Sequence, residues 1–109
     1  MAGDRFAHRR EKLIRRLQKA ETESLLVTSA TNVSYLTGFS GDSSFLLIGP
    51  DRTRLISDRR YAIQIAEECP RIATYIREPS LQMWDAVAEI VEHMKLQQLG
   101  FEKPHHGQR

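Results

Sequence analysis

The spacing of hydrophobic residues predicts a helix over most of the first twenty positions. The apolar residues of this segment share one helical face: Phe6, Leu13, Ile14 and Leu17. We expect the helix to begin after Asp4, whose side chain can cap the free amide groups, and to end near Ala20. The basic residues between the apolar ones then cover its solvent face.

The pattern changes after this helix to a short apolar run. Residues 24–28 contain an unbroken Leu-Leu-Val run, which is typical of a strand buried on both faces. Residues 29–32 offer capping side chains for a short helix, and Gly38 can end that helix in a left-handed conformation. A loop is predicted over residues 39–42.

The middle of the chain predicts a hairpin followed by a helix. Residues 43–48 and 53–57 are strand-like and flank a turn rich in Gly, Pro and Asp, which indicates an antiparallel hairpin. Asp58 can cap a helix over residues 59–68, and Pro70 prevents the helix from continuing.

The last third predicts a strand, a long helix and a final strand. Residues 72–76 have strand character, and residues 99–102 form the last strand. Between them Pro79 and Ser80 open an amphipathic helix over residues 81–96, which Gly100 ends. The apolar stripe of this helix, expected to be buried, consists of Leu81, Trp84, Val87, Ala88, Val91 and Met94.

This order of elements predicts a single α/β domain with a mixed, mostly parallel sheet flanked by helices, because helices that alternate with strands favour right-handed parallel crossovers. The hairpin supplies the antiparallel part. We assign residues 1–102 to the domain and residues 103–109, which show no periodicity, to a mobile C-terminal tail.

Composition excludes several protein classes. The chain has 109 residues, of which 40% are hydrophobic and 28% charged, close to the average for folded domains. The single cysteine, Cys69, excludes an internal disulfide, so we expect a reducing, cytoplasmic location. No stretch is apolar enough for a membrane span, so we expect no membrane partner.

Positive charge is concentrated at the N-terminus. Seven of the first twenty residues are Arg or Lys, although the net charge of the chain is only +2. Such a cluster suits nucleic acid, but no recognised nucleic-acid motif accompanies it. We interpret the cluster as the solvated face of the first helix and expect no nucleic-acid partner.

The residues supply no evident catalytic or metal site of their own. His8 and His93 are isolated, and His105 and His106 lie in the tail, so no imidazoles and carboxylates follow a metal-ligand spacing. Ser40 lies outside any Gly-x-Ser-x-Gly motif, and no histidine is near Cys69 in the sequence. Composition and spacing therefore predict a domain without a catalytic site.

Three segments carry a family resemblance. They are Thr-Asn-Val-Ser-Tyr-Leu-Thr-Gly-Phe-Ser-Gly at 31–41, followed by the apolar strand 45–48; Leu-Ile-Ser-Asp-Arg-Arg-Tyr at 55–61, with Gln64 after it; and Leu-Gly-Phe-Glu at 99–102. In order and separation they resemble the N-terminal domain of the creatinase, prolidase and aminopeptidase P family.

The resemblance implies the accessory domain of a two-domain Xaa-Pro metallopeptidase. In that family a second domain, absent from this chain, binds two divalent metals, often manganese or cobalt. The resemblance implies no cofactor in this chain, a homodimer in the full-length protein, and proline-containing peptides as substrates. The accessory domain would then restrict substrate at the active site of the neighbouring subunit.

The resemblance also places the candidate site. The substrate-proximal loop would be Phe39, Ser40, Gly41 and Asp42, supported by Tyr35, Arg60 and Tyr61. We expect Phe39 to be an exposed contact residue, Tyr35 to pack in the core behind the loop, Asp58 to be a helix cap, and Arg60 to pair with a carboxylate. Many members of the aminopeptidase branch have Ser at the position of Asp42, so the choice between dipeptidase and aminopeptidase stays open.

Two other functions stay open from the sequence. The same domain type serves for interaction without peptidase activity in a histone chaperone subunit, so a stand-alone peptide- or protein-binding module is the first alternative. A small basic nucleic-acid-binding protein is the second.

Overall fold

The computed structural model describes residues 2–50 and 52–102. Its elements follow one another as α1 (Ala2–Lys19), β1 (Leu25–Val27), α2 (Ala30–Thr37), β2 (Phe45–Ile48), β3 (Thr53–Asp58), the 3-10 turn η1 (Arg59–Tyr61), α3 (Ala62–Glu68), β4 (Ala73–Arg77), α4 (Met83–Met94) and β5 (Gly100–Phe101). The predicted tail over residues 103–109, with His105 and His106, lies outside the described residues.

The strands form one mixed sheet in the order β4-β3-β2-β1-β5. Strand β2 pairs antiparallel with both β1 and β3, whereas β3 with β4 and β1 with β5 are parallel. Among the described strands, only β2 therefore runs against the common direction, which confirms a mixed, mostly parallel sheet. The carboxyl ends of β1, β3, β4 and β5 and the beginning of β2 consequently meet at the same edge.

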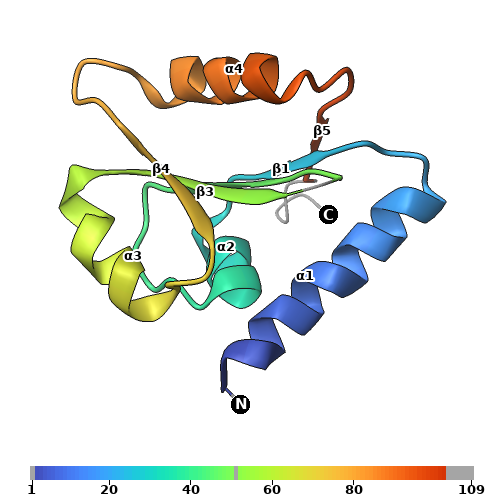
Figure 1. Ribbon diagram of the computed structural model, residues 1–109, viewed down its shortest axis with the longest axis horizontal. Coiled ribbons are helices and arrows are strands. Elements are labelled where there is room, and N and C mark those ends of the chain that lie inside the picture. Colours follow the sequence, from blue (N-terminus) through green and yellow to red (C-terminus); the bar gives the residue numbers. More distant parts are fainter. Residues whose placement is uncertain (1, 51, 103–109) are drawn as a thin grey trace, which may run out of the picture.

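Helices cover both faces of the sheet (Figure 1), with α1, α2 and α3 on one face and α4 on the other. The first face buries a cluster that includes Phe39, Leu46, Leu55 and Ile65, and the second buries one that includes Leu47, Ile56 and Ile90. Both clusters use strand residues because successive side chains point to opposite faces. Among the described helices, none combines the length and the apolar character that a membrane span requires.

The predicted signals at both ends of α2 are confirmed. The Ser29 side chain accepts a hydrogen bond from the Asn32 amide and caps the helix. At the other end Gly38 has a φ of 84°, the left-handed conformation that glycine adopts without steric cost. A Cβ atom at Gly38 would also lie 2.8 Å from Cε2 of Phe6, so α1 can pack this closely only against a glycine.

Helix α1 begins earlier than the sequence suggested. It starts at Ala2, so the prediction that it begins after Asp4 is wrong. Helix boundaries are the least certain part of a periodicity argument, because apolar spacing marks the buried face and not the first residue.

Helix α4 is shorter than expected, and it buries a different set of residues. It spans Met83–Met94 rather than 81–96, and it ends where Lys95 takes a left-handed φ of 58°, whereas Gly100 lies in β5. Its buried residues are Ala86, Val87 and Ile90.

Trp84 is 56% exposed, so its expected burial is wrong. Successive helical residues differ by about 100° around the axis, which puts Trp84 beside the buried stripe of α4. There its ring lies against Phe45 and Phe101, with centroid separations of 5.2 and 6.3 Å.

This burial pattern predicts losses of stability of different size for two truncations in α4. Ile90→Ala, at a side chain only 2% exposed, should lower the free energy of unfolding by about 2–5 kcal/mol. Trp84→Ala should cost roughly 1 kcal/mol, the contribution of its aromatic contacts. Urea denaturation followed by circular dichroism measures both. An equal or larger loss for Trp84→Ala would contradict the position assigned to its ring.

Candidate functional site

The predicted loop lies at the edge where most strands of the sheet end. It connects α2 to the beginning of β2, and the turn after β3 approaches it from the side. In open α/β sheets, ligands commonly bind outside the carboxyl ends of the strands. The location is therefore suitable for recognition.

Phe39 is completely buried, so the expectation that it is an exposed contact residue is wrong. Its ring packs in the core beneath α1–α3 and meets the Tyr61 ring edge-on at 5.4 Å between centroids. Its amide donates to the Thr37 hydroxyl at 3.0 Å. Phe39 therefore anchors the loop to the core.

Gly41 allows the loop to lie directly on these two rings. A Cβ atom at this position would be 2.4 Å from Cζ of Phe39 and 2.9 Å from Cε1 of Tyr61. Real side chains do not approach so closely, so any other residue would push the loop away from the core. The second glycine of the motif is thus explained by packing.

Asp42 is exposed and is hydrogen-bonded to Tyr61, one of the residues expected to support the loop. The Tyr61 hydroxyl donates to Oδ1 of Asp42 at 2.6 Å, and the Ser43 hydroxyl donates to the same atom at 3.3 Å. The bond from Tyr61 lowers the pKa of Asp42, and the same bond raises the pKa of Tyr61. Asp42 thus presents a fixed negative charge to solvent.

Ser40 is held from the opposite side by α3. Its amide donates to Oε1 of Glu68 at 2.8 Å, and its hydroxyl donates to Oε2 at 2.9 Å. The Gln64 amide group donates to the Ser40 hydroxyl at 3.0 Å. The bond from the Ser40 amide is the main cause that lowers the pKa of Glu68.

Glu68 was missed by the sequence reasoning, although a signal for it existed. Gln64 and Glu68 are four residues apart in a predicted helix and therefore share one helical face. Gln64 already belonged to a recognised segment, so its neighbour on that face was the natural second partner for the loop.

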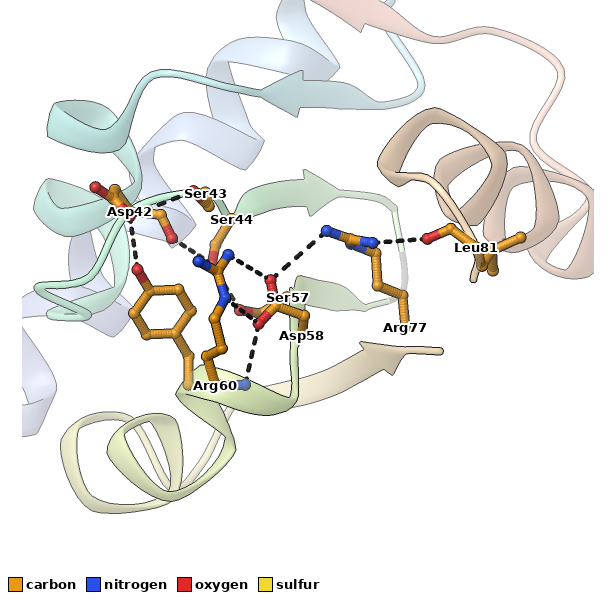
Figure 2. Close-up of polar contacts among 9 residues, drawn as sticks. Asp42, Ser43, Ser44, Ser57, Asp58, Arg60, Arg77 and Leu81 are labelled. Atoms are coloured by element: carbon orange, nitrogen blue, oxygen red, sulfur yellow. Dashed lines mark hydrogen bonds and ion pairs between the residues drawn. The ribbon is translucent and has the colours of Figure 1, made fainter. Parts of the chain in front are cut away.

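Asp58 joins the supporting turn to the rest of the sheet edge. It caps η1 by accepting from the Arg60 amide at 3.0 Å, which confirms the predicted cap. Arg60 and Arg77 reach Asp58 from different elements (Figure 2). The Arg60 guanidinium donates to Oδ2 of Asp58 at 2.8 Å, and Arg77 forms an ion pair with the same oxygen at 3.6 Å. The hydrogen bond from the Arg60 side chain is the main cause that lowers the pKa of Asp58, and the same contact raises the pKa of Arg60.

The same network extends to the loop and to the segment that precedes α4. Arg77 donates to the Leu81 carbonyl at 2.7 Å, and the Ser44 and Ser57 hydroxyls are 2.7 Å apart (Figure 2). The Ser44 hydroxyl also donates to the Asp42 carbonyl at 3.0 Å. The predicted partner of Arg60 is thus Asp58, and Arg60 serves to fix the turn that carries Tyr61.

Tyr35 is 56% exposed, so the expectation that it packs in the core behind the loop is wrong. Helix α2 buries Val33, Leu36 and Thr37, which places Tyr35 on the opposite helical face. There it lies against α1, with the Arg9 guanidinium 4.0 Å from its ring centroid. Tyr35 therefore does not join the loop and Tyr61.

A second polar cluster at the same sheet edge was also missed. Oε1 of Glu102 accepts from the amides of Thr28 and Ser29, both at 2.6 Å, and Oε2 accepts from the Asn32 side chain at 2.7 Å. Burial by itself would raise the pKa of Glu102, but these hydrogen bonds outweigh it and hold the pKa below its ordinary value. The carboxylate thereby ties the end of β5 to the beginning of α2.

The described residues do not fit a bound metal. Among the side chains that the structure describes, no three His, Cys, Asp or Glu residues lie close enough together to hold a metal ion. The carboxylates of Asp42, Glu68 and Asp58 instead accept hydrogen bonds from a hydroxyl, an amide and a guanidinium group, respectively.

Comparison with known proteins gives consistent matches over most of the chain. The family model of the Creatinase/Prolidase N-terminal domain matches residues 9–107. An uncharacterized peptidase, YqhT, of Bacillus subtilis (strain 168) is 32% identical over 93 residues, which cover 85% of this chain and 26% of that protein. The chain thus spans about a quarter of the length of this curated relative.

Solved structures show the same fold. An Xaa-Pro aminopeptidase from Streptococcus pyogenes is 34% identical with a TM-score of 0.82, covering 94% of this chain and 77% of that one. The N-terminal domain of the cytoplasmic peptidase PepQ from Mycobacterium tuberculosis H37Rv is 30% identical with a TM-score of 0.78, covering 87% and 72%. An Xaa-Pro dipeptidase from Bacillus anthracis is 26% identical with a TM-score of 0.81, covering 89% and 27%.

The Glu102 contacts predict a specific pH dependence of stability. Because the folded-state pKa of Glu102 lies below its ordinary value of 4.5, its contribution is complete above that value and is lost as the pH falls through the lower folded pKa. Glu102→Gln should therefore flatten the decrease of unfolding free energy below about pH 4.5.

Denaturant titrations between pH 7 and pH 2.5 measure this slope. Glu92→Gln, at an exposed carboxylate on α4, is the matched control and should keep the wild-type slope. Identical slopes for Glu102→Gln and the wild type would show that the carboxylate does not hold β5 to α2.

Proposed function

This chain belongs to the Creatinase/Prolidase N-terminal domain family, and from that premise we propose that it is the non-catalytic N-terminal domain of an Xaa-Pro metallopeptidase. The resemblance carried by the three sequence segments is thereby confirmed. An Xaa-Pro aminopeptidase and an Xaa-Pro dipeptidase among the similar structures support the proposed reaction. The full-length protein would cleave the bond between a residue and the proline that follows it.

The catalytic machinery of this proposal lies outside the chain. Two divalent metals, manganese or cobalt, would be held by a second domain, and none of their chemistry would come from the residues described above. The full-length protein would be a cytoplasmic homodimer that acts on proline-containing peptides. In it this domain would contribute to dimerisation and limit which peptides enter the partner subunit's active site.

The observation that carries the proposed role in substrate restriction is the fixed, exposed Asp42. Three independent contacts hold its loop: the buried Phe39 ring, the Tyr61 hydroxyl and the Glu68 carboxylate. A loop that is already ordered loses little conformational entropy when a ligand binds. Such a loop can position a substrate, because small misplacements of the reacting bond cost large factors in rate.

The charge of Asp42 suggests what the loop would distinguish. An ionised carboxylate attracts cationic groups, and the attraction strengthens where a closed cleft excludes water. We propose that Asp42 favours peptides with a positive charge before proline, whether a free amino group or a basic side chain. Phe39 would act only by anchoring the loop, and Arg60 only by fixing the Tyr61 turn.

A first prediction concerns the isolated chain. The 109-residue protein should hydrolyse no Xaa-Pro peptide, with or without added manganese, because metal catalysis needs a fixed coordination shell. The measurement is proline release from an Xaa-Pro dipeptide by the purified species. Turnover that follows this species through purification and is abolished by a chelator would overturn the assignment of catalysis to another domain.

A second prediction concerns Asp42 in the full-length enzyme. Asp42→Asn should lower kcat/KM by about fivefold or more for peptides with a cationic residue before proline, and by less than about twofold for neutral ones. Tyr61→Phe should also lower kcat/KM for peptides with a cationic residue before proline, but by a smaller factor, since it removes the hydroxyl that orients the carboxylate.

The matched control for this experiment is Asp85→Asn. Asp85 is an exposed carboxylate on α4, on the other face of the sheet, so its replacement should leave both kcat/KM values unchanged. Steady-state kinetics on a dipeptide and on a longer peptide also separates the two enzyme branches. Equal kcat/KM for wild type and Asp42→Asn on every substrate would leave the loop a structural turn and the domain a dimerisation scaffold.

A further inference from the structure

A groove separate from the candidate loop lies along α1, where this helix packs beside α2. Its volume is about 860 Å³, within the range of pockets that accept a small molecule or a short peptide segment. Five of the lining side chains are basic: Arg5, His8, Arg9, Lys12 and Arg16. Glu11 is the one carboxylate among the described residues that line it.

Arg9 is held in a fixed orientation at the centre of the groove. Its guanidinium lies 4.0 Å from the centroid of the exposed Tyr35 ring and donates to the Tyr35 carbonyl at 2.9 Å. It also lies 5.4 Å from the Phe6 ring. A guanidinium fixed in this way presents its remaining N–H groups as a planar fork that fits a carboxylate.

The other basic side chains that line the groove carry no acidic partner of their own among the described residues. In the part of the chain that the structure describes, Arg5, His8, Lys12 and Arg16 form no ion pair. They recur at spacings of three and four residues and so share one helical face. The positive charges of Arg5, Lys12 and Arg16 are therefore not paired with any carboxylate that the structure describes.

The distribution of charge indicates how large an anionic partner can be. The first twenty residues carry seven basic and two acidic side chains, a net +5, while the whole chain carries +2, so the remainder carries −3. The surplus of positive charge is therefore concentrated on α1, which favours a short anionic segment that lies along this helix.

The aromatic rings at the groove disfavour nucleic acid. The Tyr35 ring is covered by Arg9, and the Phe6 ring by Arg5 and Arg9 at 5.0 and 5.4 Å. Single-stranded nucleic acids are bound by stacking bases on open aromatic rings, and here a guanidinium group already lies over the Tyr35 ring and over the Phe6 ring. Carboxylates need only the N–H donors, which stay accessible.

We propose that the α1 groove binds a short acidic peptide segment, a run of Asp and Glu residues on a partner protein. Arg5 and Arg16 are eleven residues apart, about 16 Å along a helix, which an extended segment of roughly five residues spans. Arg9 receives a carboxylate at the centre of the groove, and Arg5 and Arg16 bind the two ends. This interaction is independent of the proposed peptidase function.

The test uses the 109-residue chain and a fluorescein-labelled peptide of six Glu residues. Fluorescence anisotropy at 0.15 M salt should give saturable binding, whereas a six-residue Gln peptide should not bind. Arg5→Glu with Arg16→Glu should weaken the Kd at least tenfold. The matched control, Arg52→Glu with Arg71→Glu, makes the same change in net charge at exposed sites outside the groove and should alter the Kd less than threefold, since remote charges are screened at this salt.

Arg9→Lys distinguishes a built site from a general positive field. It keeps the charge but loses the planar fork, so the Kd should weaken about fivefold while circular dichroism confirms that the fold is intact. The proposal is overturned if both double variants weaken binding equally, or if the Gln peptide binds as well as the Glu peptide. A thymidine oligonucleotide that binds more tightly than the peptide through the same arginines would also overturn it, in favour of nucleic acid.

Discussion

The packing of the Phe39 ring beneath Gly41 is the constraint on which the candidate site depends. The ring is fully buried, and the glycine lies so close to it and to Tyr61 that no Cβ atom fits. Burial of an aromatic ring dominates local packing energy, so the loop follows the ring into place. Its polar contacts to Tyr61 and Glu68 then fix the direction in which Asp42 points. A recognition surface is thus built on the core itself.

The helix before this loop is fixed at both of its ends. At the amino end of α2, the Glu102 carboxylate accepts from Thr28, Ser29 and Asn32. At the carboxyl end, Arg9 and Arg10 of α1 donate to the carbonyls of Tyr35 and Leu36 at 2.9 and 2.8 Å. Both arrangements match the polarity of the helix dipole, which favours anions at the first turn and cations at the last. The α1 groove and the loop are therefore built around the same short helix.

The sequence was sufficient for the architecture but not for the burial of its aromatic residues. Strands, turns and caps depend on local spacing, so the hairpin, the Gly38 turn and the Asp58 cap were predicted correctly. Whether Phe39, Tyr35 or Trp84 is covered depends on elements distant in the sequence, and all three were predicted wrongly. The bond of Glu68 to Ser40 and that of Glu102 to Asn32 were missed for the same reason, since these partners are 28 and 70 residues away. Charge clustering on α1, by contrast, was visible from the start, and only the fold showed that it lines a groove.

The central claim, that the loop is rigid before any ligand arrives, is tested most directly by ¹⁵N relaxation on the isolated chain. Backbone order parameters of Ser40, Gly41 and Asp42 should equal those of the neighbouring helices, about 0.85. In Gly41→Ala they should fall toward 0.6, because the added Cβ atom displaces the loop from Phe39. Wild-type values already below about 0.6 would contradict the account, since a loop that flexible could not present Asp42 in one position.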